Sequence, residues 1–290
     1  MKLNMFDYDT KKDFSLMYKI ERRWRINRQT SMKVLITSGG TKVKIDLVRS
    51  ITNMSRGTFG SQICDSFWKN LIMSSDSPEN NEIVFFHAKN SRMPIAKDSR
   101  NFCYDSGIHA IRYIEYDTFD DYRLKLTDLL KAEKFDIIVL AAAVSDYGVA
   151  NYFNGKYHSS DDMTIKLVKL PKVITEVREL AHDATICGFK LLVNSTDEEL
   201  REAMDKQFAE NGIELCVGND LRDIKADDHR LTIKFNESLM KRGLEPTDMN
   251  KEFMTYTKSW AKEHGLRLSD IVVEKCLEAN KLKREMEVRV

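Results

Sequence analysis

Two glycine-containing segments near the start of the sequence could together bind a phosphate group. Segment 38–41 reads SGGT, in which Gly39 and Gly40 permit close approach of a ligand to the backbone and Thr41 adds a hydroxyl. Segment 53–60 reads NMSRGTFG and opens a helix, whose first N–H groups and dipole would suit a phosphate. Ordinary turn glycines explain the pattern equally well, because it lacks both the P-loop pattern and the GxGxxG of dinucleotide-binding proteins.

Other polar residues follow later apolar runs and could contact a nucleotide. Asp146 comes directly after the run 137–144, where a carboxylate could hold a pair of ribose hydroxyls, although an N-cap or turn Asp fits the same position. Lys156 and His158 lie in the polar loop 154–162, NGKYHSSDD. Either side chain could close over a charged substrate or simply be solvated. The six histidines show no ligand spacing such as HxxxH, so the sequence suggests no zinc site.

Short apolar strands alternate with amphipathic helical patterns along most of the chain. The expected strands are 33–37, 82–88, 111–116, the continuous apolar run 135–147, 164–169, 185–192, 214–220 and an edge hairpin strand at 229–235. The expected helices are 61–70, 119–134, 172–180, 197–212 and 268–285. Thr196 before the helix 197–212 and Gly212 at its end are start and stop signals.

This alternation predicts an α/β fold: a Rossmann-like, doubly wound, mostly parallel sheet with helices on both faces. The carboxyl ends of its strands would then bring the polar strand ends together at one edge, where open sheets bind ligands. We expect an N-terminal extension at 1–31, one α/β domain at 32–235 and a C-terminal helical extension at 236–290. The last helix could still belong to the domain.

Composition limits the function classes. The 290 residues carry 46 Lys plus Arg against 45 Asp plus Glu, a net charge of +1, which disfavours nucleic-acid binding through bulk positive charge. The longest apolar run is far shorter than a membrane span needs, and the N-terminal segment is rich in charges and does not resemble a secretory signal. Five widely spaced cysteines suggest reduced thiols of a cytosolic protein.

Taken in order, the motifs resemble those of phosphopantothenoylcysteine synthetase, over residues 33 to about 234. The matching motifs are Leu35–Thr41, Ile45-Asp46, Val48-Arg49, Ile51-Thr52-Asn53 with Ser55, Gly57 and Gly60, then Ala141–Tyr147, a lysine in the following loop, Lys169-Leu170-Pro171, Gly188-Phe189-Lys190 and Asn219-Asp220. The sequences AAAVSDY and GFKLL are most similar to those of the stand-alone bacterial synthetases, which lack a fused decarboxylase domain.

The resemblance implies a ligase of coenzyme A biosynthesis that joins 4′-phosphopantothenate to L-cysteine. In that family a nucleoside triphosphate, which is CTP in most bacteria, activates the pantothenate carboxylate as an acyl-nucleotide with loss of pyrophosphate. Cysteine then displaces the nucleoside monophosphate, which is CMP where the triphosphate is CTP. A carboxylate needs such a leaving group before it can acylate an amine. The resemblance further implies a Mg²⁺ cofactor, a homodimer and small molecules as partners. The cysteines, net charge and apolar runs predict a cytoplasmic location and neither nucleic-acid nor membrane partners.

Site residues follow from the resemblance by matching positions. The catalytic group comprises Asn53, which turns over the acyl-nucleotide, with Arg49 as a nearby positive partner and Lys156 on a flap. Nucleotide contacts fall on Ala142, Ala143, Asp146 at the ribose, Lys156, Pro171, Lys172, Val173, Ile174, and Phe189 against the base. Phosphate and substrate contacts fall on Gly39, Gly40, Thr41, Ser55, Gly57 and Gly60.

Some positions depart from the family pattern. Met54 and Arg56 stand where many members read Asn-Arg-Ser-Ser-Gly, and only Lys206 falls near two nucleotide-binding lysines of the fused enzymes. The choice between CTP and ATP therefore stays open. Two other functions compete with the ligase: an NAD(P)-dependent Rossmann-fold oxidoreductase, and a non-catalytic nucleotide-binding protein. The missing GxGxxG and Tyr-x-x-x-Lys pair disfavour the oxidoreductase, and the retained Asn53 and Lys156 disfavour a non-catalytic role.

Overall fold

The computed structural model describes residues 31–75, 77–96, 111–158, 162–225, 228–240 and 253–287. Their centre is an eight-stranded sheet with the order β12-β11-β10-β9-β6-β1-β4-β5. The strands are β1 (Lys33–Ser38), β4 (Glu82–Ala88), β5 (Ile111–Tyr116), β6 (Ile137–Leu140), β9 (Thr185–Leu192), β10 (Leu215–Asp220), β11 (Arg230–Phe235) and β12 (Met254–Thr257). The first six in chain order are mutually parallel, whereas β11 and β12 run antiparallel at one edge.

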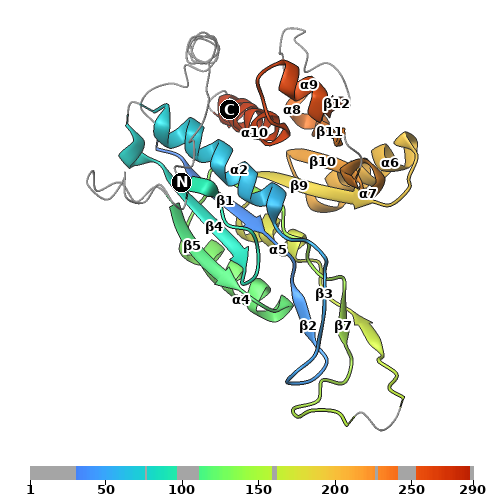
Figure 1. Ribbon diagram of the computed structural model, residues 1–290. Coiled ribbons are helices and arrows are strands. Elements are labelled where there is room, and N and C mark those ends of the chain that lie inside the picture. The colour runs from blue at the N-terminus through green and yellow to red at the C-terminus, as the bar shows by residue number, and fades with distance from the viewer. Residues whose placement is uncertain are drawn as a thin grey trace, which may run out of the picture.

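Helices cover both faces of this sheet (Figure 1). One face carries α2 (Thr58–Trp68), which continues as the π-helical turn Lys69–Met73, and α10 (Leu268–Glu287). The other carries α4 (Phe119–Ala132), α5 (Val173–Leu180) and α6 (Asp197–Asn211). The short helices are Pro78–Asn80 (3₁₀), α7 (Leu221–Lys225), α8 (Glu237–Met240) and α9 (Lys258–Glu263). The predicted α/β fold class, doubly wound around a mostly parallel sheet, is confirmed.

Burial on both faces explains why the central strands read as continuous apolar runs. In β1, Val34 and Ile36 pack toward α2 and α10, while Leu35 between them packs toward α4. The six parallel strands follow the order β5-β4-β1-β6-β9-β10, so the direction of winding reverses between β1 and β6. The carboxyl ends of these two strands flank the topological switch point, where doubly wound sheets bind their ligands.

Two short β-ribbons project from the carboxyl edge of the sheet (Figure 1). One pairs β2 (Lys42–Lys44) with β3 (Ser50–Thr52), and the other pairs β7 (Tyr147–Val149) with β8 (Leu167–Lys169). Backbone hydrogen bonds join them: Leu47 N donates to Gly155 O (3.0 Å) and Phe153 N to Ile45 O (3.2 Å). We call the described residues 42–52 and 147–169 the arm.

The structure corrects several sequence expectations. The apolar run 135–147 is not one strand: β6 ends at Leu140, because the N–H of Ala142 turns to the side chain of Thr37 in β1 (3.1 Å), and the chain then enters the arm. The strand expected at 164–169 is confined to β8. β11 is not the sheet edge, since β12 pairs outside it and α10 packs on the same sheet. Residues 1–30 of the N-terminal extension, residues 241–252 and Cys103 lie outside the described residues.

Candidate active site

The turns after β1 and β6 are hydrogen-bonded to each other at the switch point. Ala143 N donates to Gly39 O (2.8 Å), and Thr41 N donates back to Ala143 O (3.1 Å). The hydroxyl of Thr41 adds two contacts with Ser145, accepting from its N–H (2.9 Å) and lying 3.1 Å from its hydroxyl. The structure therefore brings the glycine turn and the Ala142-Ala143 turn together, as the sequence expectation requires.

Asn53 lies against both of these turns. Its Nδ2 donates to Ala143 O at 2.7 Å, and its backbone N–H donates to Thr41 O at 3.4 Å. A β-carbon on Gly40 would come within 2.8 Å of Asn53 O, so glycine is what allows Asn53 to approach so closely. The half-buried amide is thus fixed at the switch point by groups from the turns after β1 and β6.

The segment 53–60 packs its glycines onto the end of β1. Gly57 has φ +70° and forms the N-cap of α2, and its carbonyl accepts from the Ser38 hydroxyl (3.1 Å). Ser55 Oγ accepts from Gly57 N (3.3 Å), and a β-carbon on Gly60 would strike Ser38. No side chain caps α2 among the described residues, and no acid lies in its first turn. Its first N–H groups therefore remain available to an anion at the carboxyl edge of the sheet.

The other side of the switch point is formed by the start of α5. Asp146 pairs with Lys172 (2.5 Å), and Asp146 O accepts from Leu170 N (2.9 Å). This places Asp146 beside the predicted nucleotide segment Pro171–Ile174. Within that segment Lys172 occupies the N-cap position of α5, and no side chain accepts a hydrogen bond from the first N–H groups of this helix. Both partners of the ion pair are exposed, so the pair is weak and could exchange for contacts with a bound ligand.

Arg49 and Lys156 lie on the arm rather than beside Asn53. The Arg49 guanidinium donates to Asp46 Oδ2 (3.0 Å) and to Tyr157 O (3.3 Å), while Lys156 is exposed next to Tyr157. Burial raises the pKa of Asp46, but N–H groups of Val48, Arg49 and Tyr157 and the charge of Arg49 outweigh it and hold the pKa below its ordinary value.

This buried carboxylate therefore ties the two ribbons of the arm together. Arg49 and Asn53 lie at opposite ends of β3, because Ile45 N donates to Arg49 O while Asn53 N donates to Thr41 O. Within one chain the structure brings Arg49 near the Lys156 loop and not to the Asn53 amide.

Phe189 lies on the opposite face of the sheet from Val173 and Ile174. Its ring is half-buried on the α2 side, 6.0 Å from the ring of Phe59, whereas Val173 and Ile174 pack on the α4 side. Phe59 also contacts the ring of His229 at 6.0 Å. Phe189 is therefore not brought to the Pro171–Ile174 segment, although it lies at the same edge of the sheet.

His229 was not expected from the sequence. It precedes β11, and its Nε2 lies 3.1 Å from Oδ1 of Asn219 near the end of β10. Burial lowers the pKa of His229; the charge of Asp223 opposes this and that of Lys258 adds to it. No local spacing could have marked His229, because its neighbours come from α2 and β10.

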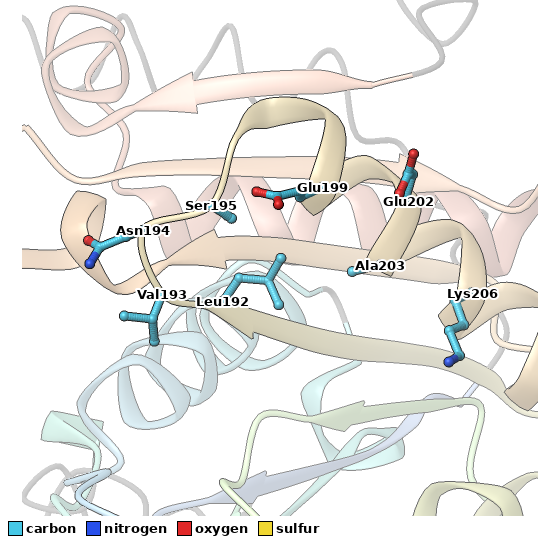
Figure 2. A pocket seen from close by; sticks show the side chains of 8 residues that line it. All are labelled: Leu192, Val193, Asn194, Ser195, Glu199, Glu202, Ala203 and Lys206. Atoms are coloured by element: carbon cyan, nitrogen blue, oxygen red, sulfur yellow. The ribbon is translucent and has the colours of Figure 1, made fainter.

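Asp220, the residue after Asn219, holds the loop after β9 in place through hydrogen bonds. Its carboxylate accepts from Ser195 N and Oγ (both 2.8 Å), Asn194 N (3.2 Å) and Arg222 N (2.8 Å), and these bonds lower its pKa to about 2. The loop borders a cleft of about 510 Å³ against α6 (Figure 2). Its lining residues are Leu192, Val193, Asn194, Ser195, Glu199, Glu202, Ala203 and Lys206.

The described residues offer no metal site of their own, since no group of three or more His, Cys, Asp or Glu side chains converges among them. The four described cysteines are unpaired and buried, and burial raises the pKa of Cys216 to about 12, so these thiols are poor nucleophiles. Within the described segments, no helix is both long and apolar enough to cross a bilayer.

The strand order, the glycine turn and an uncapped helix N-terminus at the switch point define a Rossmann-like α/β protein with an edge suited to phosphate-bearing ligands. Residues 29–70 and 110–254 match the family described as DFP, the DNA/pantothenate metabolism flavoprotein C-terminal domain, and the chain belongs to this family. The family relationship inferred from the sequence motifs is thereby confirmed.

Known relatives agree with this assignment. The coenzyme A biosynthesis bifunctional protein CoaBC of Thermococcus kodakarensis is 28% identical over 218 residues, which are 75% of this chain and 48% of that protein. The chain thus spans about half the length of the curated relatives it matches.

Among solved structures, the DNA/pantothenate metabolism flavoprotein of Streptococcus pneumoniae aligns with a TM-score of 0.62 at 25% identity, covering 85% of this chain and 97% of that one. A Cab2 mutant in complex with phosphopantothenate-cysteine aligns with a TM-score of 0.69 over 98% of this chain and 97% of that one. At 17% identity, this second likeness concerns the fold.

Proposed function

We propose that this protein is a phosphopantothenate–cysteine ligase of coenzyme A biosynthesis. The observation that carries the proposal is the position of Asn53, whose amide is fixed between the glycine turn and Ala143 at the switch point of a chain that belongs to this family. The relatives support it, because one is named for coenzyme A biosynthesis and a neighbour in fold holds phosphopantothenate-cysteine.

The proposed reaction has two steps. A carboxylate oxygen of 4′-phosphopantothenate attacks the α-phosphorus of CTP or ATP, and the bond to the β-phosphate oxygen breaks to release pyrophosphate. The amine of cysteine then attacks the acyl carbon of the acyl-nucleotide, the nucleoside monophosphate leaves with the bonding electrons, and the amine loses a proton. The product is 4′-phosphopantothenoylcysteine. The triphosphate and phosphopantothenate are both anionic, so donors at the site must offset their mutual repulsion.

The residues at the edge suit these steps in order. The N–H groups of α2 and the glycine turns, with Ser55, would hold the triphosphate, and Asp146 with the Ala142-Ala143 turn would bind the ribose. Pro171–Ile174 and Phe189 lie on opposite faces of the sheet at the same edge, so they would contact the rest of the nucleotide from its two sides. The Asn53 side-chain N–H would donate a hydrogen bond to the acyl-nucleotide in place of its present hydrogen bond to Ala143 O.

Lys156, exposed on its loop, would close over the charged substrate as a flap. Because the described residues form no metal site, the Mg²⁺ of the proposal would be held mainly by the triphosphate. We place the ligase domain in residues 32–235, completed by β12 and α10 on the same sheet.

The assembly we propose is a cytoplasmic homodimer joined through the arm. Large apolar side chains are exposed on both ribbons, including Leu47, Val48, Phe153 and Leu167. A second copy of the arm would cover them, since exposed large apolar side chains gathered on one part of a protein commonly mark an interface. Light scattering of the full chain reports its oligomeric state, and a monomer at micromolar concentration would refute this assembly.

The ligase proposal is tested by incubating the protein with 4′-phosphopantothenate, cysteine, Mg²⁺ and either CTP or ATP. Phosphopantothenoylcysteine, pyrophosphate and nucleoside monophosphate should appear in equal amounts, and comparing the nucleotides gives the base preference. A folded protein that yields no product with either nucleotide would refute the assignment. Saturable fluorescence quenching by NADPH would then revive the oxidoreductase alternative.

A further inference from the structure

His229 and Asn219 form a polar pair at the carboxyl edge of the sheet. Asn219 belongs to the motif Asn219-Asp220, but neither side chain has a role in the site described so far. Asn219 lies near the end of β10 on the same face as Phe189, since Val217 two residues earlier pairs with Phe189 across the sheet. His229 precedes β11 and places its ring against Phe59, which also contacts Phe189. Four side chains from α2, β9, β10 and the start of β11 thus converge beside the first turn of α2.

The hydrogen bond between them fixes the Asn219 amide. Nε2 of His229 lies 3.1 Å from Asn219 Oδ1. An amide oxygen only accepts, so Nε2 must carry the hydrogen, and Oδ1 is thereby occupied. Nδ2 has no acceptor among the described residues, yet it is not one of their fully buried unpartnered atoms, so it reaches the surface as a free donor.

We infer that His229 is a positioning residue for nucleotide binding: it orients Asn219 so that Nδ2 donates to an acceptor atom of the base of a nucleotide held beside Phe189. This rests on the proposed function for the identity of the ligand as a nucleoside triphosphate. His229 does not itself touch the ligand. A buried amide left free to rotate would present oxygen and nitrogen alternately and lose this preference for acceptors.

The test measures binding, not turnover. Isothermal titration with CTP and with ATP, each with Mg²⁺, compares wild type with the variants Asn219→Ala, His229→Ala, His229→Gln and the double alanine variant. His229→Ala should weaken the better-bound nucleotide about five- to tenfold, the effect of losing one well-placed neutral hydrogen bond. His229→Gln should bind within about twofold of wild type, because its amide N–H can still donate to Oδ1.

The double variant separates positioning from a structural role. If His229 acts through Asn219, the double variant should bind no more weakly than Asn219→Ala alone, whereas independent effects would multiply. His182→Ala is the matched control, because this exposed histidine precedes β9 at the opposite edge of the sheet and should leave binding unchanged.

Unchanged affinity in His229→Ala, multiplying effects, failure of His229→Gln to restore binding in a folded protein, or a wild type that binds neither nucleotide would each overturn the inference. A wild type that binds nucleotide but forms no product would instead refute the ligase while leaving this test readable.

Discussion

Replacing Gly40 by alanine should slow the step that consumes the acyl-nucleotide. The added β-carbon would lie 2.8 Å from Asn53 O and 3.2 Å from Asn53 Cβ, where an ordinary contact is at least 3.4 Å, so Asn53 must retreat by about 0.6 Å. The backbone itself tolerates alanine, because the φ of Gly40 is not positive. A misplacement of about 1 Å can cost roughly 100-fold in rate, so we expect roughly a tenfold loss. Overpacking should also cost about 1–3 kcal/mol of stability.

Single-turnover measurements separate the two steps in the Gly40→Ala variant. Pyrophosphate release reports activation and phosphopantothenoylcysteine reports product formation, and the second should fall more than the first. Gly212→Ala is the matched control: this residue ends α6 with φ +57°, and its β-carbon would lie 3.8 Å from Arg178. The Gly212→Ala substitution should lower the free energy of unfolding by about 1 kcal/mol, because alanine is strained in the left-handed conformation. It should leave activity unchanged. A Gly40→Ala enzyme with a wild-type product step, or a Gly212→Ala enzyme equally impaired, would refute the reasoning.

Three further predictions concern single side chains. Asn53→Ala should let acyl-nucleotide accumulate while product formation falls roughly 100-fold, as for loss of one oriented donor; equal loss of both steps in quenched-flow assays would make Asn53 structural. Lys156→Gln should slow nucleotide-dependent pyrophosphate release about tenfold without changing Tm, as for loss of a charge-assisted hydrogen bond; unchanged release would mean a solvated lysine. Asp220, with its pKa lowered from 3.8 to about 2, should stabilise the fold above pH 4 and lose that contribution as pH falls toward 2. Urea midpoints of wild type and Asp220→Asn should therefore differ at pH 7 and converge near pH 2, and a constant difference would contradict this.

Elements with strong local signals could be predicted from the sequence. The strand 185–192 is observed over the same residues, because its apolar run is bounded by polar turns and buried by helices on both sides. The helix 197–212 begins with a capping box between Thr196 and Glu199 and ends at Gly212 in the left-handed conformation, as its start and stop residues indicate. Here local preference and tertiary packing agree.

The features that could not be predicted from the sequence depend on contacts between distant segments. Nothing local separates strand from turn in the run 135–147, since the turn is made by a hydrogen bond to the Thr37 side chain on another strand. β12 has only four residues and gains its identity by pairing with β11. Arg49 is near Asn53 in sequence but lies at the other end of β3, a separation set by the length of the β2–β3 hairpin.

Because the chain is near neutral, something other than net charge must offset the charge of the proposed anionic ligands. In the part of the chain that the structure describes, helices α2, α4, α5 and α6 follow the parallel strands and begin at the carboxyl edge of the sheet, so their N-termini face the proposed ligand edge. The N-termini of α4 and α6 are capped by side chains. Thr118 caps α4 and Thr196 caps α6, and each helix also has acidic residues in its first turn. The two helices that flank the switch point differ, because neither α2 nor α5 has a side-chain cap and α2 has no acid in its first turn. Of these four described helices, the two beside the proposed triphosphate site thus have N-termini without a side-chain cap. Their backbone N–H groups can supply positive potential that a net charge of +1 does not reveal.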